Sequence, residues 1–189
     1  YIQMKSGHSI PFLGLGTWTL TGSECENAVA AALELGYRHI DTAYKYENQD
    51  RIANAIGQSG IDRSDLFITS KIWKDSTQYE KTLKQADEIL QQLQTDYLDL
   101  LLIHWPVEDV PVEETLRAFT QLADDRKVLS FGVSNFKTDD LSEALEAAEI
   151  PICNNQILYN PGRHDDDTVE FCRKHGITVT AYSPLERGD

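Results

Sequence analysis

Four side chains that can hold, donate or polarise a proton follow apolar, β-like runs in this chain. Asp41 and Tyr46 come at the end of one such run, Lys71 ends a second, and His104 ends a third. Reducing a carbonyl with a hydride creates an alkoxide that must be protonated as it forms, so the reaction needs a positioned acid. These residue types, each at the end of an apolar run, therefore indicate carbonyl chemistry.

Each of the four groups suits a different role in that reaction. Tyr46 is the candidate acid, because a phenol with a pKa of ~10 is protonated at neutral pH. Lys71 would stabilise the phenolate left behind, and Asp41 would keep Lys71 charged in a dry site. His104 would hydrogen-bond the carbonyl oxygen. Taken singly, Tyr46 reads as a packing aromatic, Lys71 as a solvated charge and His104 as a core histidine. Taken together, they favour catalysis.

The four residues meet only if the strand ends converge. In a parallel (β/α) barrel, the active site lies at the carboxyl-terminal rim of the strands, so functional groups accumulate where each apolar run stops. Three later runs, ending near residues 134, 156 and 182, also close on polar or aromatic side chains. The sequence therefore predicts an α/β fold with a parallel (β/α)8 barrel.

Alternation of strand and helix patterns along the chain supports this fold class. We expect a hairpin over 1–11, a short strand over 12–18, and further strands over 38–41, 66–70, 98–103, 128–133, 152–155 and 177–181. We expect helices over 23–36, 49–57, 79–94, 112–124, 138–147 and 165–174. Ser23 with Glu26 predicts a capping box at the start of the first helix, and Gly36 predicts its end.

This pattern gives seven barrel strands, whereas a closed barrel of this kind needs eight. We expect a single barrel domain over 1–189, with the eighth strand and the remaining carboxyl-terminal α/β portion lying beyond Asp189. A sheet of seven strands leaves two unpaired edges.

Several short motifs occur in a fixed order along the whole chain. They are the segments 14–18 (GLGTW), 41–46 (DTAYKY), 104–106 (HWP), 132–136 (GVSNF), 155–156 (NQ) and 182–185 (YSPL), together with Lys71. In this order the chain resembles the aldo-keto reductase family. It is similar to compact prokaryotic members that act as diketo-gluconate or methylglyoxal reductases.

The resemblance implies a catalytic set of Asp41, Tyr46, Lys71 and His104 and the cofactor NADPH, with NADH left open. It also implies a cofactor site. The residues of that site are Ser134, Asn135, Gln156 and Tyr182 for the nicotinamide, and Ser183 and Leu185 along the pyrophosphate. From the residues alone, a Ser-Asn pair after a strand is also a common helix cap.

The three tryptophans also follow predicted strand ends. Trp18, Trp73 and Trp105 come just after the first, third and fourth barrel strands. Rim placement indicates an aromatic wall around a carbonyl pocket. The alternative is that the three rings fill the top of the barrel.

Composition and spacing argue against other classes of site and partner. A dinucleotide fingerprint would need a third glycine at Thr19, and the five dispersed histidines predict no metal site. A net charge of −14 opposes binding to nucleic acid, and no apolar run is long enough to cross a membrane. Three isolated cysteines are expected to be buried and reduced. With neither a membrane-length run nor a leader of basic then apolar residues, we expect a cytoplasmic protein. We expect a monomer.

The sequence therefore predicts NADPH-dependent reduction of small-molecule aldehydes or ketones, with Tyr46 as the general acid. An alternative is a cofactor-binding regulatory subunit with little turnover, as in the potassium-channel β proteins that resemble this family. A third option is an aldolase that uses Lys71 as a Schiff-base nucleophile.

Overall fold

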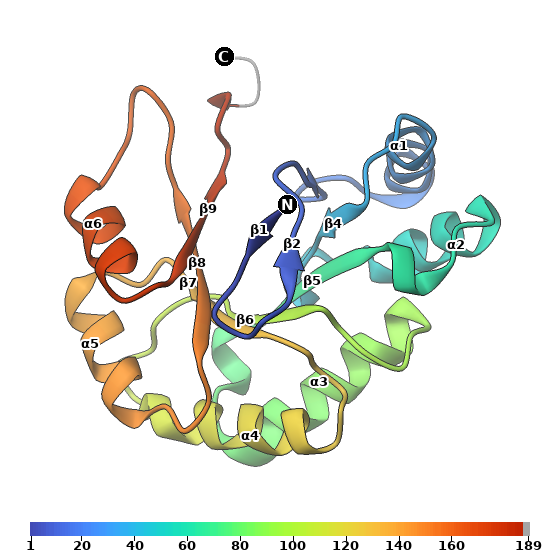
Figure 1. Ribbon diagram of the computed structural model, residues 1–189. Coiled ribbons are helices and arrows are strands. Elements are labelled where there is room, and N and C mark those ends of the chain that lie inside the picture. Colours follow the sequence, from blue (N-terminus) through green and yellow to red (C-terminus); the bar gives the residue numbers. More distant parts are fainter. Residues whose placement is uncertain (187–189) are drawn as a thin grey trace.

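The computed structural model describes residues 1–186, and its central feature is a parallel sheet of seven strands (Figure 1). The strands are β3 (Leu15–Gly16), β4 (His39–Asp41), β5 (Phe67–Ile72), β6 (Leu100–Ile103), β7 (Phe131–Ser134), β8 (Ile152–Leu158) and β9 (Thr178–Tyr182). Each strand pairs in parallel with the next strand along the chain, so their order in the sheet is their order in the sequence. The sheet curls into a nearly closed barrel, with β3 and β9 as its two edges.

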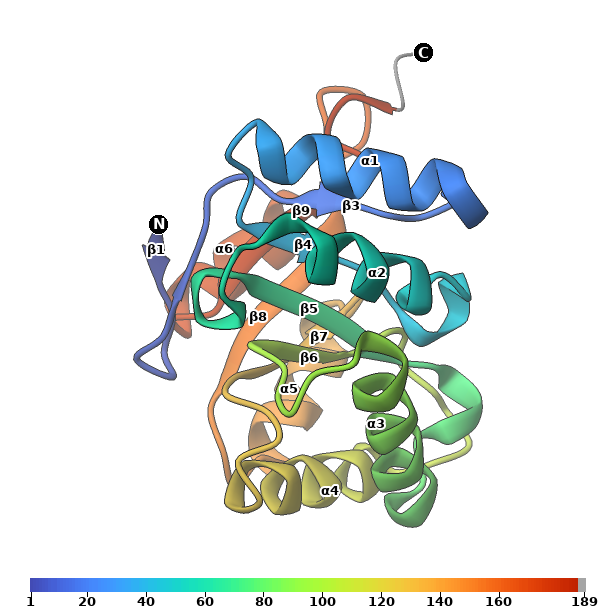
Figure 2. The same cartoon turned by 90° about the vertical axis from the view of Figure 1, so that its right-hand side faces the viewer.

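Six helices cover the outside of the sheet (Figures 1 and 2). They are α1 (Gly22–Glu34), α2 (Gln49–Ser59), α3 (Tyr79–Leu93), α4 (Val112–Asp124), α5 (Thr138–Ala147) and α6 (Asp166–Lys174). Each helix contacts the next one along the chain. Across residues 1–186, none of the helices has the length and apolar character needed to cross a bilayer.

Alternation along the strands separates an outer core from the barrel interior. On β5, every residue is buried. Ile68 and Ile72 pack outward in the main hydrophobic cluster with the helices, while Phe67 faces inward in a second cluster. Lys71 lies on the same side of the strand as Phe67, because side chains alternate with a period of two. Burial on both faces is what parallel strands in an α/β protein require.

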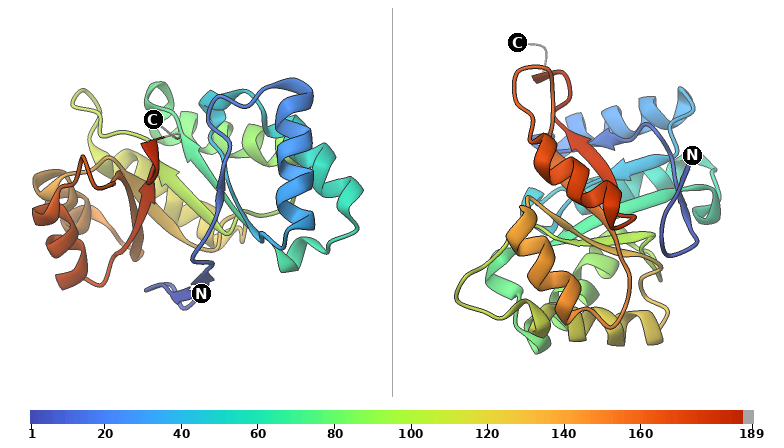
Figure 3. Two further views of the ribbon diagram at one scale, coloured as in Figure 1. Left: turned by 90° about the horizontal axis from the view of Figure 1, so that it is seen from above. Right: turned by 60° about the vertical axis from the view of Figure 1, so that its left-hand side comes forward.

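The amino-terminal hairpin lies across one end of the barrel (Figure 3). It consists of β1 (Ile2–Gln3) and β2 (Ser9–Ile10), which pair antiparallel. Met4 and Ile10 are buried against the inward-facing cluster of β5, β6 and β8. The hairpin therefore closes the amino ends of the strands, and the opposite rim carries the polar strand ends.

The sequence pattern predicts all seven barrel strands and all six helices of residues 1–186, and the structure differs from it at some boundaries and at one cap. The capping box at Ser23 and Glu26 is absent, because α1 begins one residue earlier and its cap, Thr21, makes no side-chain hydrogen bond. The short 3-10 helices η1 (Tyr44–Tyr46), η2 (Arg63–Asp65) and η3 (Lys74–Ser76) were not expected. All three cysteines are buried and unpaired, as predicted.

Gly132 lies where two strands approach closely. A Cβ at this position would collide with the backbone oxygen of Asn154 and the side chain of Leu102. The pairing of β7 with β8 shifts register beside it, between Phe131 and Gly132. Only glycine fits here without a backbone shift.

Gly132→Ala is expected to lower the free energy of unfolding by about 2 kcal/mol, because the added methyl group forces the strands apart. Chemical denaturation monitored by circular dichroism measures the change. Gly57→Ala is the matched control, since Gly57 lies in α2 and a Cβ there meets nothing within 4 Å. That variant should gain about 0.5–1 kcal/mol from helix propensity. Equal stability of the two variants would contradict the steric argument.

Candidate active site

Lys71 lies at the centre of a polar cluster at the carboxyl ends of β4 and β5. Its Nζ donates to Asp41 Oδ1 at 2.6 Å, to the Thr42 carbonyl at 2.8 Å and to the Tyr46 hydroxyl at 3.4 Å. The Lys71 side chain is completely buried. Three of the four residues predicted to be catalytic are therefore in direct contact.

The turn after β4 brings Tyr46 back over the strand end. Beyond Asp41 the chain enters η1, where the Tyr46 amide donates to the Ala43 carbonyl at 3.0 Å. Glu47 then adopts a left-handed backbone with φ of 56°, which ends the turn. The five-residue spacing between Asp41 and Tyr46 thus places a carboxylate and a phenol within reach of one ammonium group.

Electrostatics keep Lys71 protonated. Burial is the largest influence and by itself lowers the pKa of Lys71, but Asp41 and Tyr46 together outweigh it, so the pKa is raised above 10.5. A nucleophilic amine would need the opposite shift. The environment of Lys71 therefore disfavours the aldolase alternative.

Tyr46 is held in its neutral form. Burial raises the pKa of Tyr46 above 10.0, and the nearby Lys71 offsets only part of this effect. At neutral pH the phenol carries its proton, and its oxygen lies against a cation. This combination suits a group that gives up a proton only when another charge develops beside it.

His104 joins the cluster from the end of β6. Its ring lies edge-on to Tyr46, with ring centroids 5.7 Å apart, and to Trp73, with centroids 5.1 Å apart. Burial, followed by the charge of Lys71, lowers the pKa of His104 to about 3, so the imidazole is neutral at physiological pH. Its Nδ1 is buried and has no hydrogen-bond partner among residues 1–186.

Two of the three tryptophans contact the aromatic rings of the polar cluster. Trp18 packs on Tyr46 with ring centroids 4.8 Å apart, and Trp73 packs on His104. Trp18 and Trp105 are 50% and 43% exposed. Exposed aromatic rings of this kind can offer apolar surface to a ligand, so the pocket wall stays a prediction.

Asn48 holds the loop that carries one of these rings, although the sequence pattern does not single it out. Its Nδ2 donates to the Thr17 and Leu20 carbonyls, both at 2.9 Å, which fixes the loop that carries Trp18. Its Oδ1 accepts from the Thr42 hydroxyl at 3.0 Å. Asparagine just before a helix reads as an N-cap, but here its side chain caps nothing and joins two rim loops.

A second polar group forms at the ends of β7, β8 and β9. Asn135 Nδ2 donates to Ser134 Oγ at 3.0 Å, and the Tyr182 hydroxyl donates to Asn135 Oδ1 at 2.8 Å. Gln156 Nε2 donates to Asp41 Oδ2 at 2.5 Å. The two carboxylate oxygens of Asp41 therefore join Lys71 on one side and Gln156 on the other.

The remaining predicted cofactor residues lie farther along the chain. Ser183 and Leu185 follow β9, and Leu185 is largely exposed. Within residues 1–186, no hydrogen bond joins either of them to Asp41, Tyr46 or Lys71. Their expected place along a pyrophosphate stays a prediction.

His39 is a further buried polar residue that the sequence analysis did not use. It lies two residues before Asp41 on β4, and its Nε2 is 3.0 Å from the Thr69 hydroxyl. Burial lowers the pKa of His39 to about 4. A Cβ on Gly14 would overlap its ring. The available signal was the two-residue spacing from Asp41, which puts both side chains on the inner face.

Clusters suited to a metal are absent from the part of the chain that the structure describes. Across residues 1–186, no group of three or more histidine, cysteine, aspartate or glutamate side chains is placed to hold a metal ion.

The model of the Aldo/keto reductase family matches residues 12–188 of the chain. The chain belongs to this family. An aldo-keto reductase of Mycolicibacterium smegmatis is 42% identical over 188 residues, which cover 99% of this chain and 68% of the relative. The glyoxal reductase of Bacillus subtilis is 40% identical with the same coverage.

Solved structures of other aldo-keto reductases have the same fold. One, from a Medee basin deep-sea metagenome library, is 39% identical, with a TM-score of 0.96 over 98% of this chain and 68% of the other. The Bombyx mori aldo-keto reductase, solved in complex with NADP, is 34% identical, with a TM-score of 0.91 over 96% of this chain and 65% of the other.

These matches confirm the family and the parallel α/β barrel that the sequence motifs predicted. The protein is an oxidoreductase, and its reductase relatives support carbonyl reduction as the general reaction. Gly16 lies in β3, an edge strand of the barrel, and Gly14 lies in the segment just before it. These glycines therefore do not form the dinucleotide-binding turn of a Rossmann fold, in agreement with the missing third glycine.

Proposed function

We propose that this aldo-keto reductase reduces aldehydes or ketones to alcohols with NADPH, with Tyr46 as the general acid. The observation that carries the proposal is the contact among Lys71, Asp41 and Tyr46 in a buried site beside a neutral His104. The regulatory-subunit alternative has no comparable support, because a subunit without turnover does not need this arrangement of proton-carrying groups.

In the proposed reaction, the Tyr46 hydroxyl gives its proton to the carbonyl oxygen as negative charge develops there. The phenolate that remains lies 3.4 Å from the Lys71 ammonium, which stabilises it. Asp41 contributes indirectly, since its hydrogen bond to Lys71 holds that ammonium charged in a buried site.

His104 and the tryptophans are proposed to orient the substrate. A neutral imidazole has one N–H to donate, and its position beside Tyr46 directs it toward the same carbonyl oxygen. Trp18, Trp73 and Trp105 would bind the apolar part of the substrate and keep water away from the reacting carbon.

The polar groups of β7, β8 and β9 fit a nicotinamide carboxamide. Gln156 Nε2 donates a hydrogen bond to Asp41 Oδ2, while its Oε1 has no hydrogen-bond partner among residues 1–186 and stays available to an amide N–H. Ser134 and Asn135 lie beside it, and Tyr182 supplies a ring for stacking. When bound here, NADPH supplies the hydride; NADH remains a second candidate. Ser183 and Leu185 are proposed to follow the pyrophosphate.

The remaining proposals concern the cell and the state of assembly. The three cysteines are buried and unpaired, which suits a reducing compartment, so we place the reaction in the cytoplasm. We propose a monomer with a small-molecule carbonyl substrate.

The direct test is consumption of NADPH by the protein, followed by the absorbance of the reduced nicotinamide. We expect steady oxidation with methylglyoxal and with nitrobenzaldehyde and none without an aldehyde. Binding is measured in parallel, as quenching of tryptophan fluorescence by NADPH. Quenching without oxidation of NADPH by either aldehyde would favour the regulatory-subunit alternative.

A further inference from the structure

Two lysines flank the aromatic surface beside His104. The Lys45 Nζ lies 5.8 Å from the centroid of the Trp73 ring, and the Lys74 Nζ lies 5.7 Å from it. The same ring packs edge-on against His104, with centroids 5.1 Å apart. Two positive charges therefore lie near Trp73, the ring that packs on His104 at the proposed carbonyl site.

Both lysines are attached to elements that build the site. Lys45 lies in η1 directly before Tyr46, and Lys74 begins η3 directly after Trp73. The Trp73 amide donates to Gln85 Oε1 of α3 at 2.6 Å, so the backbone under the ring is held in place. Both ammonium groups are thus within cation–π distance of a ring whose backbone is held in place.

Neighbouring acids neutralise these charges only weakly. Glu47 Oε1 is 4.0 Å from Lys45 Nζ, but the Glu47 side chain is 81% exposed, so water screens the pair. Within residues 1–186, Lys74 forms no ion pair with any carboxylate. Each ammonium also keeps hydrogen-bond donors that the ring does not use.

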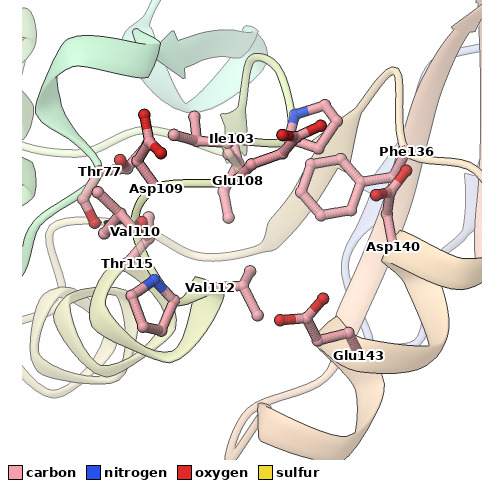
Figure 4. A pocket seen from close by; sticks show the side chains of 13 residues that line it. Thr77, Ile103, Glu108, Asp109, Val110, Val112, Thr115, Phe136, Asp140 and Glu143 are labelled. Atoms are coloured by element: carbon pink, nitrogen blue, oxygen red, sulfur yellow. Dashed lines mark hydrogen bonds between the residues drawn. The ribbon is translucent and has the colours of Figure 1, made fainter.

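The acidic groups of the next rim loop line a separate pocket. Glu108 and Asp109 line a separate pocket of about 480 Å³, together with Asp140 and Glu143 of α5 (Figure 4). This pocket lies between the loop after β6 and the start of α5, and neither Trp73 nor the two lysines line it. Among residues 1–186, the acids that line this pocket form no ion pair with Lys45 or Lys74, whose acidic neighbours on their own elements are Glu47 and Asp75.

We propose that Lys45 and Lys74 select carbonyl substrates that carry a carboxylate, which they bind beside Trp73 while the carbonyl reaches Tyr46 and His104. This inference rests on the proposed function and adds the substrate class. An acidic protein repels anions over most of its surface. A pair of lysines beside the active site would therefore both attract the carboxylate of a substrate and orient the substrate.

Two aldehydes that differ mainly in charge provide the test. They are 4-carboxybenzaldehyde, an anion at neutral pH, and its methyl ester, methyl 4-formylbenzoate, which is neutral. The measured quantity is the ratio of kcat/KM for the acid to kcat/KM for the ester, with NADPH in excess. Taking a ratio within one variant cancels any loss of folded protein or of general chemistry.

We expect the double variant K45Q/K74Q to lower this ratio roughly tenfold at low ionic strength. The control is K81Q/K84Q, which removes the same charge from the exposed side of α3 and should leave the ratio unchanged. Raising the salt concentration to about 0.5 M should lower the ratio of the native protein toward that of K45Q/K74Q, since salt screens exposed charges.

An equal ratio in the native protein and in K45Q/K74Q would overturn the inference while leaving the reductase function intact. If neither aldehyde is reduced, the proposed function fails, and binding decides the inference separately. In that case benzoate and benzamide are compared by quenching of tryptophan fluorescence. Tighter binding of benzoate that disappears in K45Q/K74Q supports the charge selection, and equal binding overturns it.

Discussion

Replacing Tyr46 with phenylalanine is expected to lower kcat for aldehyde reduction by about 10²–10⁴-fold, the usual contribution of a general acid. The substitution keeps the ring, which packs on Trp18 with centroids 4.8 Å apart, and removes only the hydroxyl that Lys71 contacts at 3.4 Å. Binding of NADPH, measured by quenching of tryptophan fluorescence, should therefore change little. Steady-state kinetics with nitrobenzaldehyde measure the loss.

Tyr44→Phe is a matched control from the same 3-10 helix. The Tyr44 hydroxyl donates to Glu88 Oε2 of α3 at 2.8 Å and, within residues 1–186, forms no hydrogen bond with Lys71. This variant loses one hydroxyl of the same kind and should keep nearly normal kcat. Full activity of Tyr46→Phe would remove that residue from the proton transfer.

The pH dependence of kcat offers an independent check on the acid. The pKa of Tyr46 is raised above 10.0 by burial, so the protonated phenol predominates at every pH below that value. Because the acid form is the active one, we expect kcat to stay level through neutral pH and to fall only as the pH rises above 10. This alkaline limb should be absent in Tyr46→Phe.

The contact among Asp41, Tyr46 and Lys71 was predictable because two features of the sequence agree. Each residue follows an apolar run of strand type, and the carboxyl ends of parallel strands share one rim. Because β4 and β5 are adjacent in the sheet, the contact can be predicted without knowing how distant parts of the chain pack. The order of the motifs along the chain added the family, which the comparisons confirm.

The hydrogen bond from Gln156 to Asp41 was not predictable in the same way. These residues are 115 positions apart and lie on β4 and β8, which do not pair with each other. Alternation along a strand tells which side chains face inward, but the curvature of the whole sheet decides which of them touch across the barrel.

A local irregularity in the pairing of β7 with β8 also makes it hard to predict which residues of β8 face inward. Phe131 pairs with Ile152, but the next residue, Gly132, pairs with Asn154, so β8 has one extra residue at this point. Regular pairing from Ile152 would have placed Asn155 opposite Ser134, whereas the shift places Gln156 there. A bulge of this kind reverses which face a residue occupies, and periodicity alone does not reveal it.

Lys71→Met is expected to have the second large effect, on both turnover and stability. The Lys71 and Asp41 side chains are only 1% and 14% exposed, and their charged atoms are 2.6 Å apart. Removing the cation leaves a mostly buried carboxylate without a counter-charge, which should lower the free energy of unfolding by about 3 kcal/mol. We expect kcat to fall at least roughly 10²-fold, since the phenolate of Tyr46 loses its stabilising charge.

The double variant D41N/K71M separates the two effects. It removes both charges, and the amide oxygen that replaces the carboxylate can still accept the hydrogen bond from Gln156. The free energy of unfolding should therefore return most of the way to that of the native protein, whereas kcat should stay low. Chemical denaturation at neutral pH measures this, because the raised pKa of Lys71 keeps its ammonium charged below pH 10.5, and that charge is lost only as the pH rises through the folded-state value. A Lys71→Met protein as stable as the native one would show that Asp41 finds its counter-charge elsewhere.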